Sequence, residues 1–210
     1  MKVDLIDSMG TDLTVVNAAR VSFDKTSSTL DEKDIKLIKY LAKHNHWSPF
    51  SHCFVQFRVK APIFIARQLA KHQVGLSWNE VSRRYVDSPP EFYEPETWRG
   101  KPENVKQGSD GEAKSQYFPN LYLGDVTELA LNNYDKMIVQ GVAPEMARMV
   151  LPQNMYTEWY WSGSLYAFSR VCQLRLDKTS QAEVQEVAVK LSAHCWSLFP
   201  HSWDALLKGV

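Results

Sequence analysis

The sequence contains little cysteine, and its cysteines form no recognisable motif. Among 210 residues only Cys53, Cys172 and Cys195 are cysteines, and no two of them form a C-x-x-C pair. An odd number of widely spaced cysteines excludes a disulfide scaffold and is typical of free thiols in a reducing compartment. We therefore predict a cytoplasmic protein, or one in the cytoplasm of an infected host if it is encoded by a virus.

The chain also lacks long apolar runs and an excess of charge. No stretch approaches the ~18 consecutive apolar residues of a membrane span, and Asp4 and Asp7 stand where a secretory signal would have an apolar core. Lys and Arg number 24 and Asp and Glu number 24, so the net charge is zero. Because no apolar run is long enough, we expect no membrane partner. Because a protein that coats duplex DNA needs a basic excess, we also expect no stable nucleic-acid partner. A local basic site remains compatible with this balance.

Hydrophobic periodicity predicts an α+β protein with more helix than sheet. The sequence lacks both G-x-G-x-x-G and G-x-x-x-x-G-K-[ST], which excludes Rossmann and P-loop modes of cofactor binding. Alternating residues predict a strand over 53–60, and aromatic residues predict another over 155–162. The expected helices cover 28–44, 62–72, 125–140, 144–151 and 164–174, and a last one begins at a capping box of Ser180 and Glu183. We expect a single domain over 1–210, with an irregular exposed loop at about 86–122.

Two of the expected helices carry predictions that the structure can test. Ser28 or Thr29 is expected to cap the helix over 28–44. In the helix over 125–140, the side chains expected to face the core are those of Val126, Leu129, Ala130, Met137 and Ile138.

The densest polar segment runs over 67–85. On the helix expected there, Gln68 shares one face with Lys71 and His72, because residues three and four apart are neighbours on a helix. The chain then passes through Gly75 into a segment rich in donors. This pattern indicates a ligand site, and a solvated charged turn is the alternative.

The segment after Gly75 carries Ser82, Arg83 and Arg84. Hydroxyl and guanidinium donors in one loop can hold a phosphate group together. Glu80, just before them, can accept hydrogen bonds from a base edge or a sugar. The residue types are therefore those of a nucleotide site.

Other candidates have ordinary structural explanations. Arg148 and Arg175 each adjoin an apolar run, and such an arginine is usually a surface or C-capping residue. His44, His46 and His52 lack partners at a usual metal-ligand spacing, so we expect no metal. None of the cysteines has the surroundings of a nucleophile.

Seven short segments nevertheless occur in an informative order. They are Met9-Gly10-Thr11-Asp12-Leu13, Ala18-Ala19-Arg20-Val21-Ser22-Phe23, His46-Trp47-Ser48-Pro49-Phe50-Ser51-His52, Ala61-Pro62-Ile63-Phe64-Ile65-Ala66-Arg67-Gln68, Asn79-Glu80-Val81-Ser82-Arg83-Arg84-Tyr85, Ala147-Arg148-Met149-Val150-Leu151-Pro152 and Leu174-Arg175-Leu176-Asp177. Each is weak by itself, but their order and spacing over nearly the whole chain resemble the flavin-dependent thymidylate synthases.

The resemblance implies a specific fold and reaction. The expected fold is α+β, with helices around an antiparallel sheet, in a homotetramer whose active sites lie between subunits. The expected cofactor is FAD, which NADPH reduces. Methylenetetrahydrofolate would supply the carbon that dUMP receives at C5, giving dTMP.

The resemblance also implies roles for individual residues. Arg175 is expected to be catalytic, because a guanidinium beside the uracil favours its ionised form and activates C5 without a cysteine nucleophile. The residues expected to bind dUMP are Gln68, Lys71, Glu80, Ser82, Arg83, Arg84, Arg148 and Arg175. Those expected to bind FAD are Ser48, Lys71, His72, Gln73, Glu80, Ser164 and Arg170.

The sequence departs from the family pattern mainly around the flavin. Lys71-His72-Gln73 replaces the usual Arg-His-Arg, and Ser164 and Arg170 stand where the family often has Asn. Gln73 lacks the positive charge of the usual Arg, and Arg170 carries a positive charge where Asn is frequent. One positive charge is therefore a candidate for relocation from position 73 to position 170. Two alternatives to a dTMP synthase therefore remain open. One is a related hydroxymethylase acting on dUMP or another pyrimidine nucleotide, and the other is a non-catalytic nucleotide-binding homologue.

Overall fold

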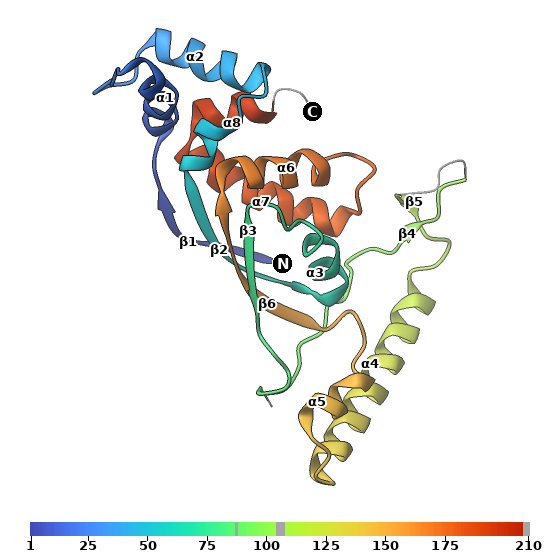
Figure 1. Cartoon of the computed structure of the whole chain (residues 1–210). Helices are drawn as coiled ribbons and strands as arrows, with labels where there is room; N and C mark the ends of the chain where they lie inside the picture. Colours follow the sequence, from blue (N-terminus) through green and yellow to red (C-terminus); the bar gives the residue numbers. More distant parts are fainter. Residues whose placement is uncertain (87, 104–107, 208–210) are drawn as a thin grey trace. The chain divides into compact units, whose positions relative to one another are not determined.

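The computed structural model describes residues 1–86, 88–103 and 108–207 (Figure 1). The chain forms two compact units. The first consists of Met1–Val59, Leu69–Asn79 and Tyr160–Val210, and the second of Lys60–Gln68 and Glu80–Trp159. The prediction of a single domain concerns how these units function together, and it stays a prediction.

A four-stranded sheet has the order β1-β2-β6-β3. The strands are β1 (Lys2–Met9), β2 (Phe54–Pro62), β3 (Leu76–Glu80) and β6 (Tyr156–Ser164). The Ile63 amide donates to the Met155 carbonyl and the Leu165 amide to the Cys53 carbonyl, so β2 and β6 run antiparallel. The strands predicted at 53–60 and 155–162 and the antiparallel sheet flanked by helices are confirmed, whereas β1 and β3 were not predicted.

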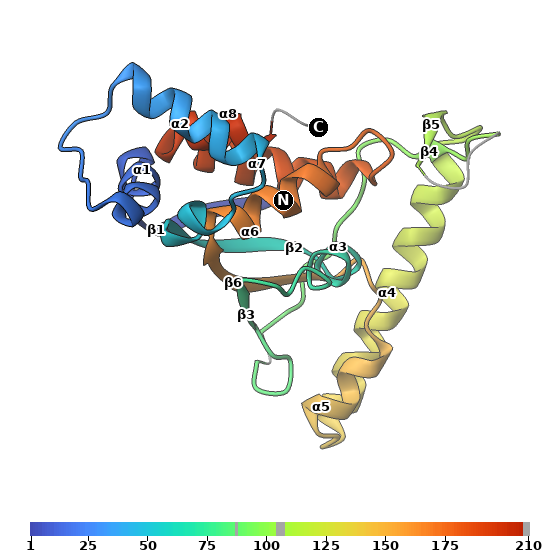
Figure 2. The ribbon, with the colours of Figure 1, turned by 45° about the horizontal axis from the view of Figure 1, so that its top comes forward.

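In the first unit, helices cover one face of the sheet. Figures 1 and 2 show α6 (Leu165–Arg175) and α7 (Ala182–Leu198) over the strands. The ring of Phe168 lies 5.1 Å from that of Phe57 and 5.2 Å from that of Trp161, and all three side chains are buried. The alternation of β2 therefore places its apolar side chains against α6. The α7 helix carries an apolar stripe that is also buried and consists of Val184, Val187, Ala188, Leu191 and Cys195.

This unit contains three further helices among its described residues. They are α1 (Asp12–Arg20), α2 (Glu32–Lys43) and α8 (Pro200–Leu207), and the single turns η1 (Val21–Phe23) and η2 (Ser48–His52) accompany them. The α8 helix packs on α2 and α6. Of these helices, α2 was predicted from the sequence, whereas α1 and α8 were not.

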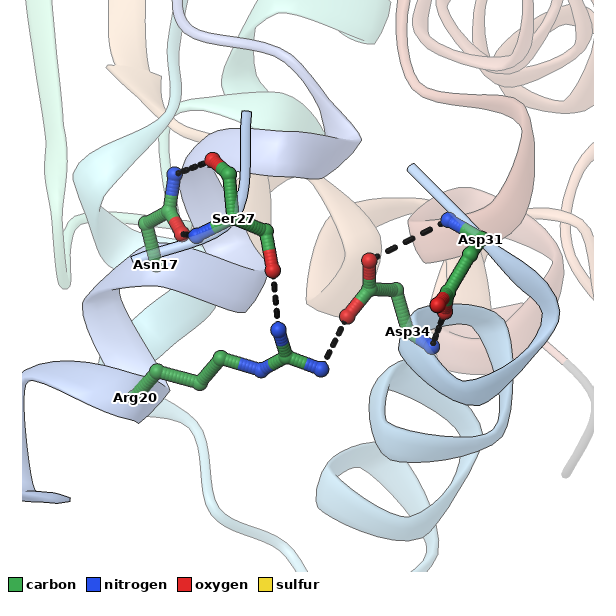
Figure 3. A network of polar contacts seen from close by, with 5 residues as sticks. All are labelled: Asn17, Arg20, Ser27, Asp31 and Asp34. Carbon is green, nitrogen blue, oxygen red and sulfur yellow. Dashed lines mark hydrogen bonds and ion pairs between the residues drawn. The ribbon is translucent and has the colours of Figure 1, made fainter. Parts of the chain in front are cut away.

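A polar network joins α1 to the start of α2 (Figure 3). Asp31 accepts from the Asp34 amide at 2.8 Å, and Asp34 accepts in return from the Asp31 amide at 3.1 Å. Arg20 links the buried Asp34 to the hydroxyl of Ser27, and Asn17 holds the backbone of Ser27. This reciprocal cap starts α2 at Glu32, so the predicted start at residue 28, with Ser28 or Thr29 as the cap, is wrong.

The second unit contains most of the irregular chain. Its elements are α3 (Ile63–Leu69), the hairpin of β4 (Arg99–Gly100) and β5 (Asp110–Glu112), α4 (Tyr117–Val139), α5 (Pro144–Ala147) and the turn η3 (Arg148–Val150). The expected loop over 86–122 therefore contains a hairpin and ends at Tyr117, where α4 begins. Residue 87 and residues 104–107 of that expected loop lie outside the described residues.

Three expectations about helices need correction. The α3 helix ends at Leu69 and not near His72. The capping box at Ser180 does not form, because the Ser180 hydroxyl donates to the Leu174 carbonyl at 3.0 Å and α7 begins after Gln181. On α4, Val126 and Leu129 are exposed where they were expected to face the core.

In the part of the chain that the structure describes, no helix is long and apolar enough to cross a membrane.

Candidate active site

A cavity of about 440 Å³ in the first unit gathers several of the predicted site residues. Lys71, His72 and Gln73 line it from the turn after α3, and Arg170 lines it from α6. The turn brings them there because the His72 amide donates to the Leu69 carbonyl at 3.0 Å. Gly75 then adopts a φ of +75°, which favours glycine, and leads into β3. Gln73 and Arg170, the two positions proposed to exchange one positive charge, thus share one cavity.

The cavity has a cationic character. Lys71 and Arg170 are exposed and take part in no ion pair within the described residues, and the described side chains that line the cavity include no carboxylate. Arg175, the last residue of α6, is half-buried, and its Nε donates to Nε2 of His72 at 3.0 Å. Burial lowers the pKa of Arg175 from its usual value. This chemistry suits an anionic ligand.

His72 is uncharged in this setting. Burial and then the charges of Arg175 and Arg170 lower the pKa of His72 to about 4. The imidazole is therefore neutral near pH 7 and able to accept a hydrogen bond.

A second group of predicted residues belongs to the second unit. Glu80 stands at the end of β3, and its Oε1 accepts from the Thr157 hydroxyl on β6 at 2.8 Å. The Val81 amide also donates to the Glu158 carbonyl at 2.8 Å. These contacts orient Glu80. Sequence reasoning missed Thr157, and no local pattern signals it, since the two residues are 77 positions apart.

Ser82 and Arg84 meet in the turn that follows. The Tyr85 amide donates to the Ser82 carbonyl at 3.0 Å, which closes the turn. The Ser82 hydroxyl accepts from the Arg84 backbone amide at 3.3 Å and from its Nε at 3.2 Å. The guanidinium of Arg84 also lies over the Tyr85 ring, and that of Arg83 donates to the Ser88 carbonyl. The predicted combination of hydroxyl and guanidinium donors is thus present in one loop.

The remaining nucleotide candidates occupy short helical elements of the second unit. Gln68 is half-buried on α3. Arg148 is exposed in η3, where its Nε donates to the Glu145 carbonyl at 3.2 Å. The prediction that Gln68 shares a helix face with Lys71 and His72 is wrong, because α3 ends before both of them.

Two predicted flavin residues lie elsewhere in the first unit. The Ser164 hydroxyl accepts from the Ala167 amide at 3.2 Å and so caps α6. Ser48 lines a larger cavity of about 1130 Å³, together with Arg20, His46 and Trp47. The last three were not predicted as site residues, although all lie in segments that carry the family resemblance.

The cysteines are buried and offer no nucleophile. Burial is the main cause that raises the pKa of the Cys53 thiol to about 12, and burial also raises the pKa values of Cys172 and Cys195. The thiolate needed for nucleophilic attack is therefore scarce at neutral pH. Among the described residues no group of His, Cys, Asp or Glu side chains is arranged to hold a metal ion.

Comparison with protein families gives one match that spans most of the chain. Residues 4–201 match the family model described as thymidylate synthase complementing protein. A flavin-dependent thymidylate synthase of Thermus thermophilus is 41% identical over 99% of this chain and 77% of its own. One of Thermosipho africanus is 39% identical over 97% of this chain and 90% of its own.

Solved structures agree with this assignment. A UMP/dUMP methylase from Streptomyces cacaoi, bound with 5-Br dUMP, superposes with a TM-score of 0.89 at 30% identity. That comparison covers 99% of this chain and 94% of the other. A second structure, bound with 5-Br UMP, gives a TM-score of 0.87 at 30% identity and covers 99% and 93%.

Proposed function

The chain belongs to the thymidylate synthase complementing protein family, and on that premise we propose that it is a flavin-dependent enzyme that methylates dUMP at C5 to give dTMP. The observation that carries the proposal is identity of 41% to a flavin-dependent thymidylate synthase over 99% of the chain. The likeness to a structure bound with 5-Br dUMP supports a pyrimidine nucleotide as substrate.

The cationic lining of the cavity in the first unit supports FAD as its ligand. Lys71 and Arg170 supply positive charge without an ion-pair partner among the described residues, and Gln73 adds an amide donor. Such a donor set suits the two phosphate groups of FAD. We propose that these residues hold FAD with His72, Ser48, Ser164 and Glu80. When bound, the flavin supplies the two electrons that it receives from NADPH.

Arg175 is the proposed catalytic residue. Ionised uracil carries negative charge on its ring oxygens, and this charge makes C5 nucleophilic. After C5 has formed its bond to the one-carbon unit, the C5 hydrogen leaves as a proton. A guanidinium held in a partly buried position stabilises the negative charge of the ionised ring more strongly than water does. Methylenetetrahydrofolate donates the carbon at the methylene level, so one hydride equivalent converts it to methyl and releases tetrahydrofolate.

The proposed dUMP-binding residues besides Arg175 are Gln68, Lys71, Glu80, Ser82, Arg83, Arg84 and Arg148. Nε of Arg84 donates to the Ser82 hydroxyl in this turn, which places a hydroxyl and a guanidinium side by side. Both groups can donate to a phosphate, and this supports a role in holding the phosphate of dUMP. The contact with Thr157 supports Glu80 as an oriented acceptor.

We also propose that the two units act as one domain in a homotetramer whose active sites lie between subunits. The family match over residues 4–201 covers parts of both units. The α4 helix leaves Phe118, Tyr122 and Leu129 at least half exposed, and such a row of apolar side chains favours association. Three buried free thiols are typical of a reducing compartment and support the cytoplasm.

One other substrate and one other product are to be compared with dUMP and dTMP. UMP is a candidate substrate, because a related structure is described as a UMP/dUMP methylase and holds 5-Br UMP. A hydroxymethyl product is the other possibility, because the sequence departs from the family pattern around the proposed flavin cavity.

The decisive experiment measures the mass of the nucleotide product. The protein is incubated without oxygen with FAD, NADPH, methylenetetrahydrofolate and either dUMP or UMP, and Arg175→Ala serves as the inactive control. A methyl group on dUMP is the expected result. A hydroxymethyl product would support the alternative reaction, and unchanged nucleotides would favour the non-catalytic homologue.

A further inference from the structure

The contact between Arg175 and His72 joins two distant parts of the sequence. Arg175 ends α6, and His72 lies in the turn after α3, 103 positions earlier in the chain. Nε of Arg175 donates to Nε2 of His72 at 3.0 Å. The turn is itself held by the bond from the His72 amide to the Leu69 carbonyl. The backbone of His72 is thus held in place, and its side chain holds the guanidinium of Arg175.

The direction of this hydrogen bond determines the protonation of the imidazole. Nε of an arginine always carries hydrogen, so Nε2 of His72 must be the acceptor. Only a neutral imidazole with its proton on Nδ1 offers a lone pair at Nε2. An imidazolium would instead present a hydrogen and a positive charge to Arg175.

We propose that neutral His72 is a positioning residue for Arg175. By accepting a hydrogen bond from Nε, it holds the plane of the guanidinium and so orients the group that is proposed to act on the uracil. This inference rests on the proposed function, because it assumes that Arg175 acts on the uracil. It gives His72 a role distinct from the flavin contact that the family resemblance implies.

The surroundings of His72 maintain its neutral form. Arg175 and Arg170 face it from α6, Lys71 precedes it in the same cavity, and no carboxylate is among the described lining residues. Its pKa is lowered to about 4, whereas an ordinary histidine titrates at about 6.5. The acceptor therefore persists at pH values where an exposed histidine would be partly charged.

Two substitutions separate positioning from flavin contact. The amide oxygen of His72→Gln can accept from Nε of Arg175, and His72→Leu has no acceptor. A hydrogen bond to a charged group is typically worth enough to change a rate by roughly 10- to 100-fold. We expect His72→Leu to lower kcat by about this factor, and His72→Gln, which keeps an acceptor for Nε, to recover most of that loss.

Because His72 is also proposed to contact FAD, kcat is expressed per bound flavin, which is measured from absorbance per subunit. In an Arg175→Ala background, His72→Leu should cause no further loss of kcat, because there is no guanidinium left to position. Equal losses in the Gln and Leu variants, or losses that follow flavin occupancy, would overturn the proposal.

Nitrogen NMR of the imidazole tests the inference independently of turnover. In protein labelled with ¹⁵N-histidine, the signal that His72→Gln removes should report a neutral ring protonated at Nδ1 from about pH 8 to about pH 5. A proton on Nε2, or a charged ring at about pH 6, would overturn the inference. If no nucleotide is methylated, the proposed function fails, while this spectrum still decides the state of His72.

Discussion

The position of Arg175 is suited to a charged group that works in a partly dry site. It ends α6, where the helix dipole favours a positive charge. Its side chain is half-buried, which lowers its pKa, but an arginine pKa starts so high that the group stays charged near pH 7. An oxyanion is stabilised best by a positive group that stays charged and is held in a fixed position.

Replacement of Arg175 should therefore remove chemistry more than cofactor binding. We expect Arg175→Ala to lower kcat by about 100-fold or more, with flavin absorbance per subunit unchanged. Arg175→Lys should also be slow, because lysine keeps the charge and loses the planar fork. Arg99→Ala, in the exposed β4–β5 hairpin, is the matched control and should keep its rate. An Arg175→Ala variant that keeps most of its kcat contradicts the proposed mechanism.

Among the structural elements, a close approach of two glycines positions the turn before β3. A Cβ on Gly163 of β6 would lie 2.4 Å from the Gly75 carbonyl oxygen and 2.6 Å from the Leu76 side chain. Only glycine at residue 163 allows the backbone of β6 to come so near. The turn that carries Lys71, His72 and Gln73 leads directly into this contact, so packing of β6 against β3 supports the cationic cavity.

Gly163→Ala tests this packing. Its methyl group must displace backbone atoms, so we expect the free energy of unfolding to fall by about 2 kcal/mol. Gly124→Ala on α4 is the matched control, since its Cβ would meet nothing within 4 Å. It should raise the free energy of unfolding by about 0.5 kcal/mol through helix propensity. Urea denaturation measures both, and equal effects would show that the contact is unimportant.

At the scale of the whole molecule, α4 leaves apolar side chains exposed that an assembly could bury. The α4 helix buries Ala130 and Tyr134, while Phe118, Tyr122 and Leu129 remain 53%, 61% and 62% exposed. These three lie at helical spacing on another side of the same helix. An apolar face left uncovered by its own chain fits the homotetramer that we propose.

A charge on that face should weaken the assembly. We expect Leu129→Lys to shift the protein from tetramer towards smaller species in sedimentation velocity, because burying an unpaired charge is unfavourable. Asp135→Lys places the same side chain on an exposed position away from the apolar face, and it should leave the sedimentation coefficient unchanged. The same shift in both variants, or in neither, would argue against α4 as the interface.

Local patterns predicted the elements whose residues are buried by neighbours in the same unit. The alternate apolar side chains of β2 and the apolar stripe of α7 are both buried. Each pattern gathers apolar side chains on one face of its element, and neighbouring elements cover that face. Boundaries were less predictable. Asp31 and Asp34 bond reciprocally and start α2, and in a sequence rich in possible caps this choice depends on three-dimensional partners such as Arg20.

The sequence by itself determined the family, since the order of seven short segments already identified it and the family match over 4–201 agrees. The odd number and wide spacing of the cysteines also predicted free thiols, and the structure shows that all three are free and buried. Only the tertiary structure decided that Gln73 and Arg170 share a cavity and that Arg175 bonds to His72. Periodicity reports which side of an element is apolar, but it carries no information on which residues a hundred positions apart will meet. That pairing arises when the sheet brings the turn after α3 beside α6.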